Sequence, residues 1–223
     1  MKLTAETFAT QVAAALGPRL ITLLLYGSAA RGAPGKGGAD TLLVADRMDD
    51  ELFAQLAAPV RAWVRAGNPA PLLFTEREWR ESADAFPIEY LDIREAHRVL
   101  VGRDPWGGIA VNSAHVRRQL EHELMGKLVH LRQVRAALWG DRKRLAAVVA
   151  PTLAGFRAML RAVLRLAGRA DTASGADDAV LRDAAAVIGF STDGLAGDPD
   201  PAAYLQAVAR TAEYVNRMER MPS

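Results

Sequence analysis

The sequence predicts an α/β (α+β) protein in which a mixed sheet with flanking helices is followed by an all-α helical bundle. In the first half of the chain, apolar runs typical of strands alternate with amphipathic helix patterns. From residue 113 onward, apolar residues recur only at helical spacing. The chain has 223 residues and no cysteine, so it is long enough to bury a core, and disulfides and cysteine zinc sites are excluded. We therefore predict two domains, residues 1–112 and 113–223.

Helices and strands are expected to alternate through residues 1–112. The continuous apolar run over 20–26 is typical of a strand that is buried on both faces. Turn-rich and capping residues mark the other boundaries. The expected elements are a helix capped by Thr4 and ended by Gly17-Pro18, a strand over 20–26, a Gly-rich loop over 27–38, a strand over 39–46, a helix starting at Asp49 or Asp50, a strand over 71–74, a short helix opened by a Thr75/Glu78 capping box, and a strand over 88–93.

Residues 113–223 are expected to be helical throughout. Leucine and valine recur every three or four positions from Val116 to Leu138, and Gly140 ends this helix. Asp141 is expected to cap a second long helix, with a kink at Pro151. A polar loop over 169–176 then precedes helices over 177–188 and 199–218. Four helices with short links are typical of an up-and-down bundle.

The charge of the chain differs between its halves. Residues 1–112 hold 12 Lys and Arg against 14 Asp and Glu, a net charge of −2, whereas residues 113–223 hold 16 against 12, a net charge of +4. Neither half is basic enough to require a nucleic-acid partner. Arg157, Arg161 and Arg165 recur every four residues and are expected to form a solvated basic ridge.

The sequence gives no sign of a membrane segment. No apolar run approaches the roughly 18 residues that indicate a membrane span. The first 20 residues carry Glu6 and have helical spacing, so they do not fit a signal peptide. Together with the absence of cysteine, this predicts a cytoplasmic protein with no membrane partner.

One stretch carries a chemical signature: LLLYGSAARGAPGKGGADTLLVAD, residues 23–46. An apolar strand leads into Gly27 and Ser28, and a second strand begins about a dozen residues later. Glycine lets backbone amides approach a phosphate closely, a serine hydroxyl adds a donor, and Arg31 supplies a charge suited to phosphate oxygens. We therefore take Gly27, Ser28 and Arg31 as candidate nucleotide-binding residues.

This stretch resembles the nucleotidyltransferase fold of the DNA polymerase β type, in small bacterial versions with a GSxARG loop before a strand reading SDIDLLV. The resemblance covers about residues 20–100. In that family two aspartates, one residue apart, lie on the same side of the strand and hold two magnesium ions against the triphosphate. The resemblance implies that an active enzyme would use Mg²⁺ and a nucleoside triphosphate.

The chain departs from the family at the metal-binding strand. Aligning Leu42-Leu43-Val44 with the family's LLV places the two aspartates at Ala39 and Thr41. Asp40 lies between them, and strand alternation points its side chain to the opposite face. A local bulge in the strand would turn the Asp40 side chain to the metal-binding face, where it would serve as a metal ligand. Otherwise Asp40 is a solvated or capping residue.

The family's third carboxylate comes from a later strand. Glu89 holds that position in IEYLDI, residues 88–93, and Asp92 is expected on the other face. Glu89 is therefore a candidate metal ligand or catalytic base. The alternative is an ion pair between Glu89 and a basic neighbour.

The helical half resembles the C-terminal domains of aminoglycoside and related adenylyltransferases. Glu123 and Lys127 lie four residues apart, at the edge of the apolar stripe. The resemblance implies that Glu123 deprotonates an acceptor hydroxyl, and we group Lys127 with the nucleotide-binding residues. The alternative is a partly buried ion pair. Gly126, between them, suggests close approach of another backbone or a ligand.

Three functions remain open from the sequence. The first is a nucleotidyltransferase-like protein with a degenerate metal site, which serves as a non-catalytic nucleotide-binding, anion-binding or regulatory module. The second is an active Mg²⁺-dependent enzyme that transfers an adenylyl group to a small-molecule hydroxyl, with Asp40 and Glu89 as metal ligands. The third is a protein whose helices mediate homodimerisation or partner binding.

Overall fold

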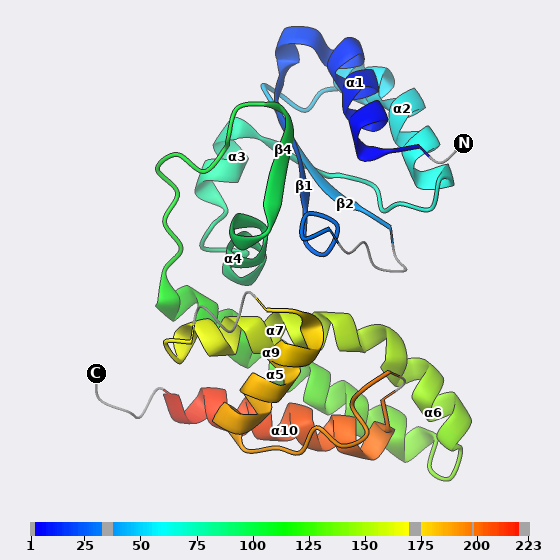
Figure 1. The fold of residues 1–223 in the computed structure, drawn as a ribbon, viewed down its shortest axis with the longest axis vertical. Coiled ribbons are helices and arrows are strands. Elements are labelled where there is room, and N and C mark those ends of the chain that lie inside the picture. The colour runs from blue at the N-terminus through cyan, green and yellow to red at the C-terminus, as the bar shows by residue number, and fades with distance from the viewer. Residues whose placement is uncertain (1–2, 33–37, 170–174, 198, 219–223) are drawn as a thin grey trace. The chain divides into compact units, whose positions relative to one another are not determined.

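The computed structural model describes residues 3–32, 38–169, 175–197 and 199–218, and the chain divides into two compact units, Met1–Val111 and Asn112–Ser223 (Figure 1). A mixed sheet with flanking helices and a helical second unit confirm the predicted fold class. Parts of two predicted loops, 33–37 and 170–174, lie outside the described residues.

The first unit is built on a four-stranded sheet. Its strands are β1 (Leu20–Tyr26), β2 (Asp40–Ala45), β3 (Leu72–Thr75) and β4 (His97–Gly102), in the spatial order β3-β2-β1-β4. β1 is antiparallel to β2 and to β4, whereas β2 and β3 are parallel. β1 and β2 occupy the centre of the sheet, so both faces of their aliphatic runs are buried.

Helices cover both faces of this sheet (Figure 1). On one face lie α1 (Ala5–Leu16), followed by the 3₁₀ turn η1 (Gly17–Arg19), and α2 (Asp50–Arg65). On the other face lie α3 (Glu76–Glu81) and α4 (Pro87–Glu95). The predicted caps are confirmed, because the side chains of Thr4, Asp49 and Thr75 accept hydrogen bonds from the first turns of α1, α2 and α3.

The strand predicted over 88–93 is wrong, because these residues belong to helix α4. Pro87 starts the helix in the first-turn position that tolerates proline. Its core contact follows the helical period: Tyr90 and Ile93 are buried three residues apart, and the Tyr90 ring stacks on Trp79 with 4.2 Å between centroids. The strand that completes the sheet is β4, the next apolar segment along the chain.

The second unit is entirely helical among its described residues. Its elements are α5 (Ser113–Ala137), α6 (Arg142–Val149), the 3₁₀ turn η2 (Ala150–Thr152), α7 (Leu153–Leu166), α9 (Asp177–Ile188) and α10 (Pro201–Met218). Asp141 caps α6 as predicted, and the turn η2 at Pro151 interrupts the helix where a kink was expected. α5 packs against α7 and α10, and α7 packs against α9.

The predicted solvated ridge of arginines is wrong at Arg161, which is buried with 4 % of its surface exposed. Its guanidinium donates to Asp177 Oδ1 at 2.6 Å and to the carbonyl oxygen of Gly175 at 2.9 Å. Arg157 pairs with the same carboxylate at 3.3 Å. Arg157 and Arg161 of α7 therefore face α9, which packs against that side of the helix.

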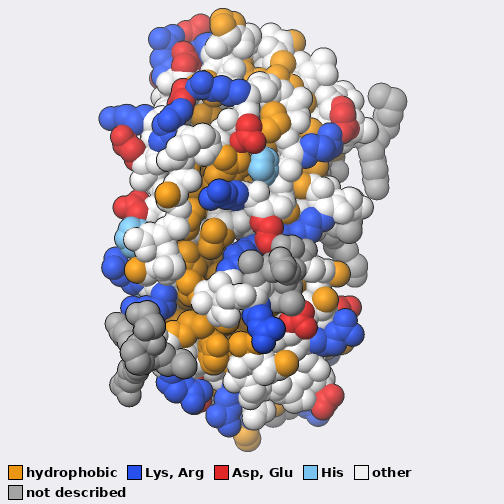
Figure 2. Space-filling view, turned by 60° about the vertical axis from the view of Figure 1, so that its left-hand side comes forward, with side chains coloured by type: hydrophobic (Ala, Val, Ile, Leu, Met, Phe, Trp, Pro, Cys, Tyr) orange, Lys and Arg blue, Asp and Glu red, His pale blue; other side chains and the backbone are white. Residues whose placement is uncertain are grey.

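Among the described residues, the segment Arg142–Leu166 is the one stretch long and apolar enough to cross a membrane, because an 18-residue window within it has a mean hydropathy of 1.4. Half of that window is buried inside the protein. On the face shown in Figure 2, basic and acidic side chains are interspersed.

Candidate functional site

The Gly-rich loop begins where the central strand β1 ends. Gly27 has a positive φ of 68°, a conformation that side-chain-bearing residues rarely adopt. Its N–H donates to the carbonyl oxygen of Ala96 at 2.9 Å, and its carbonyl oxygen accepts from the N–H groups of Ala30 and Arg31 at 3.1 and 3.2 Å. These bonds form a tight turn that fixes Ser28 and Arg31 beside the end of β1.

Asp40 lies next to this turn. It is the first residue of β2 and pairs with Tyr26, the last residue of β1. Its Oδ2 is 3.7 Å from the position that a Cβ on Gly27 would occupy. Burial raises the pKa of Asp40, and the negative charge of Asp92 raises it further. The half-buried carboxylate therefore gives the loop a negative neighbour.

The two positions that alignment assigns to the family's aspartates lie on the other face of β2. Leu43 and Ala45 pack into the core under α1 and α2, and Ala39 packs against that core. Thr41 shares this face by strand alternation and is only 1 % exposed. An aspartate at residue 41 would therefore be buried in the core. The strand carboxylate on the loop side is that of Asp40.

Helix α4 brings further carboxylates to the loop. Arg31 Nη2 lies 3.4 Å from Asp92 Oδ1 and 3.9 Å from Glu95 Oε2. Burial raises the pKa of Tyr26, and the charges of Asp40, Asp92 and Glu89 raise it further, in that order. The negative charges of Asp40, Asp92 and Glu89 thus act on the Tyr26 hydroxyl. We call Gly27, Ser28, Arg31, Asp40 and Asp92, together with Tyr26 and Glu89, the loop site.

The donor set of the loop site does not match a two-metal centre. Carboxylate oxygens are the ligands that Mg²⁺ prefers. Leu42, the next β2 residue on the Asp40 face, is fully buried, so the strand supplies one carboxylate where the family supplies two. Within the ranges that the structure describes, no group of three or more His, Asp and Glu side chains is placed to hold a metal ion.

Glu123 and Lys127 lie in the second unit, on α5. Glu123 Oε1 accepts a hydrogen bond from Gln119 Nε2 at 2.6 Å. Burial lowers the pKa of Lys127, and the charge of Glu123 opposes that shift. A Cβ on Gly126 would meet no atom within 4 Å among the described residues, so the expected close approach at Gly126 is not made within this chain.

Sequence reasoning missed Tyr26 and Asp92 as members of the site and Glu95 as a neighbour of Arg31. Tyr26 had a usable signal, because it is a polar aromatic residue at the end of an otherwise aliphatic strand and directly before Gly27. Asp92 and Glu95 lacked one, since assigning residues 88–93 to a strand turned Asp92 away from Glu89. In helix α4, Asp92 and Glu95 are three residues apart, so they lie on the same face of the helix.

No protein-family model matches this chain, and no curated protein sequence matches it either. The interpretation of the loop site therefore depends on its own geometry and chemistry.

Proposed function

We propose that the loop site binds the phosphate groups of a nucleotide or a similar small-molecule anion, and that the protein is a non-catalytic binding or regulatory module. The observation that carries this proposal is the turn at Gly27, which holds Ser28 and Arg31 at the end of the central strand. A hydroxyl and a guanidinium held at one turn are groups that bind phosphate oxygens.

Arg31 is the residue on which phosphate binding depends. Its separations from Asp92 and Glu95, 3.4 and 3.9 Å, are longer than the 2.7–2.9 Å typical of a strong charge-assisted hydrogen bond. A phosphate can accept two parallel N–H bonds from a guanidinium. An incoming phosphate therefore replaces the carboxylates as the partner of Arg31.

The donor set favours binding over group transfer. Two-metal phosphoryl chemistry needs carboxylates that bridge two cations. On the loop side of β2, Asp40 is followed two residues later by the buried Leu42, so this strand offers one carboxylate and not two. Magnesium is therefore expected to be dispensable for binding.

Calorimetric titration with ATP, with and without Mg²⁺, tests the proposal. We expect ATP to bind in EDTA. Arg31→Gln should weaken this binding about tenfold or more, because a hydrogen bond to a charged group contributes roughly 1.5–3 kcal/mol. The matched control is Arg98→Gln, which removes an arginine paired with Glu6 at 2.8 Å in the same unit. An unchanged affinity in Arg31→Gln, or an equal loss in Arg98→Gln, would contradict the proposal.

A second candidate is active Mg²⁺-dependent nucleotidyl transfer to a small-molecule hydroxyl. It is favoured by one observation: Asp40 faces the loop without any bulge at that end of β2. In this case ATP would bind only with Mg²⁺, and pyrophosphate would be released when an acceptor alcohol is added. Absence of ATP binding in both conditions would leave the helical partner-binding function.

We also propose that the protein acts in the cytoplasm. The proposal is supported by the absence of cysteine, which suits a reducing compartment, and by the nucleotide ligand inferred above. Fractionation of cells that express a tagged chain tests it, and a membrane or secreted fraction would contradict it.

A further inference from the structure

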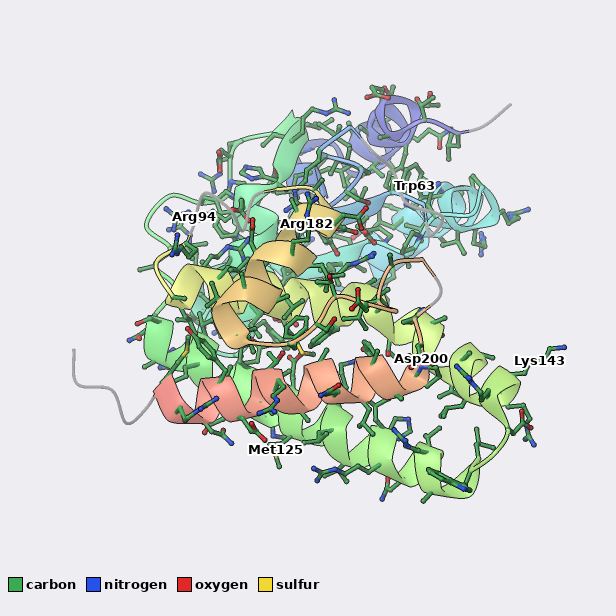
Figure 3. The ribbon with its side chains drawn as sticks, turned by 60° about the horizontal axis from the view of Figure 1, so that its bottom comes forward. Trp63, Arg94, Met125, Lys143, Arg182 and Asp200 are labelled. Carbon is green, nitrogen blue, oxygen red and sulfur yellow. The ribbon has the colours of Figure 1, made fainter. Side chains whose placement is uncertain are left out.

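A second concave site lies in the helical unit, and the loop site does not include it. It is a hollow of about 510 Å³ between the end of α5, the start of α6 and the start of α10. That volume is within the range of small-molecule sites, about 300–1,000 Å³. Its wall includes Arg135, Leu138, Trp139, Arg142, Asp200 and Pro201, and we call it the Trp139 pocket. In Figure 3, Asp200 marks the place where α10 begins beside α6.

Trp139 provides this pocket with an aromatic surface. It is 77 % exposed, whereas Trp63 and Trp79 are 1 % exposed. The guanidinium carbon of Arg135 lies 5.4 Å from the centroid of the Trp139 ring, in the geometry of a cation–π contact. Leu138, Leu145 and Pro201 add apolar atoms to the wall. An indole that forms one wall of an apolar pocket is suited to stacking with a planar ring.

The charges of the pocket favour an anion. Arg142 Nη2 donates to Asp200 Oδ1 at 2.8 Å, so these two charges offset each other. The other oxygen of Asp200 accepts from the N–H groups of Ala202 and Ala203 at 3.1 Å, which fixes this carboxylate at the start of α10. Arg135 has no ion pair among the described residues. The pocket therefore keeps one positive charge beside the indole.

We propose that the Trp139 pocket binds a planar aromatic anion, that is, an aromatic ring that carries a carboxylate or a phosphate. The ring stacks on Trp139, and the acidic group accepts hydrogen bonds from Arg135 and Arg142. A guanidinium has five N–H donors, and the bond to Asp200 uses one Nη of Arg142. A cationic ring is disfavoured by the net positive charge. This proposal is independent of the loop site.

The test uses two probes that share this chemistry but differ in acidic group: AMP and 1-naphthoate. Each is titrated calorimetrically into the full chain, with adenosine, naphthalene-1-methanol and inorganic phosphate as comparisons that lack either the charge or the ring. Because AMP also belongs to the ligand class of the loop site, its titration is repeated in the Arg31→Gln variant. AMP binding that is unchanged in Arg31→Gln and weakened in Trp139→Ala is assigned to the Trp139 pocket.

Matched variants distinguish the contribution of aromatic stacking to binding from that of the positive charge. Trp139→Ala is expected to weaken binding about fivefold or more, as loss of a stacked aromatic does, and Trp139→Phe to retain most of it. Arg142→Gln should weaken the anionic probes and leave the neutral rings unchanged. Lys143→Gln is the control, because Lys143 projects from α6 away from Asp200 (Figure 3).

Three results would overturn the proposal: no binding of either anionic probe, equal affinity for charged and neutral rings, or an equal loss in Lys143→Gln and Arg142→Gln. Circular dichroism of each variant checks the fold, and the high exposure of Trp139 predicts unchanged melting for both of its variants.

Discussion

Asp40→Asn is the most informative single change in the loop site, because it removes one negative charge and preserves the size of the side chain. Asp40 Oδ2 lies 3.7 Å from the Cβ position of Gly27, so a phosphate held by the loop would be about 6 Å from this carboxylate. Two unit charges at that separation repel by about 0.7 kcal/mol in water and by about 2.8 kcal/mol at an effective dielectric constant of 20. Asp40 is half-buried, so an intermediate value of about 1–2 kcal/mol applies.

The substitution is therefore expected to tighten metal-free ATP binding about five- to thirtyfold. Isothermal titration calorimetry with ATP in EDTA measures this change, and the titration is repeated with Mg²⁺. Glu81→Gln is the matched control, because it removes an exposed carboxylate from α3 in the same unit. The control should leave the affinity within about twofold.

The opposite sign would refute the reasoning. If Asp40 is a magnesium ligand, Asp40→Asn lowers ATP affinity in the presence of Mg²⁺ and abolishes pyrophosphate release. Weaker binding in Asp40→Asn would therefore support the active enzyme over the non-catalytic module. Equal tightening in Glu81→Gln would attribute the effect to net charge rather than to the loop site.

Three further predictions concern stability. Burial and the charge of Asp92 raise the pKa of Asp40, so its ionised form is less favourable in the folded than in the unfolded chain. Asp40→Asn should therefore raise the Tm at pH 7–8. Thermal melts should show that this gain shrinks as the pH falls through the raised pKa toward about 4. Thr41 Oγ1 is buried without a hydrogen-bond partner among the described residues. In urea unfolding, Thr41→Val should therefore be neutral or stabilise the protein by about 1 kcal/mol, whereas Thr41→Asp should prevent folding. A soluble, folded Thr41→Asp protein would contradict the assignment of residue 41 to the core. Asp177→Asn should destabilise the protein by about 1–3 kcal/mol, because Asp177 is the partner of the buried Arg161. Asp178 is 81 % exposed, so Asp178→Asn should cost less than about 1 kcal/mol. Equal melting temperatures of the two variants would show that the burial of Arg161 does not matter.

Local sequence patterns predicted most of the fold. Side chains that cap a helix act on the first turn of their own segment, so Thr4, Asp49, Thr75 and Asp141 could be identified without any tertiary contact. The run over 20–26 could be assigned to a buried strand because every residue before Tyr26 is apolar or β-branched. Signals of this kind need only a few neighbouring residues.

The segment 87–95 shows where local patterns fail. Ile88 and Tyr90 fit the alternation of a strand, whereas Tyr90 and Ile93 fit one face of a short helix. The contact that decides between strand and helix is the stacking of Tyr90 on Trp79. The Tyr90 hydroxyl also donates a hydrogen bond to the Trp79 carbonyl oxygen at 2.6 Å. This contact joins residues 11 apart across a turn, so no window of local sequence contains its energy.

The sequence by itself determined the α+β class, the helical second half, and the Gly27-Ser28 turn with Arg31 after it, because these depend on periodicity and on the conformational freedom of glycine. Only the tertiary structure decided which face of β2 meets the loop. Alignment by counting places the carboxylate positions at residues 39 and 41, but the pairing of Tyr26 with Asp40 and the packing of α1 and α2 put those residues on the core side. A shift of one residue along a strand moves a side chain to the opposite face, and only the partners of that strand fix which face is buried.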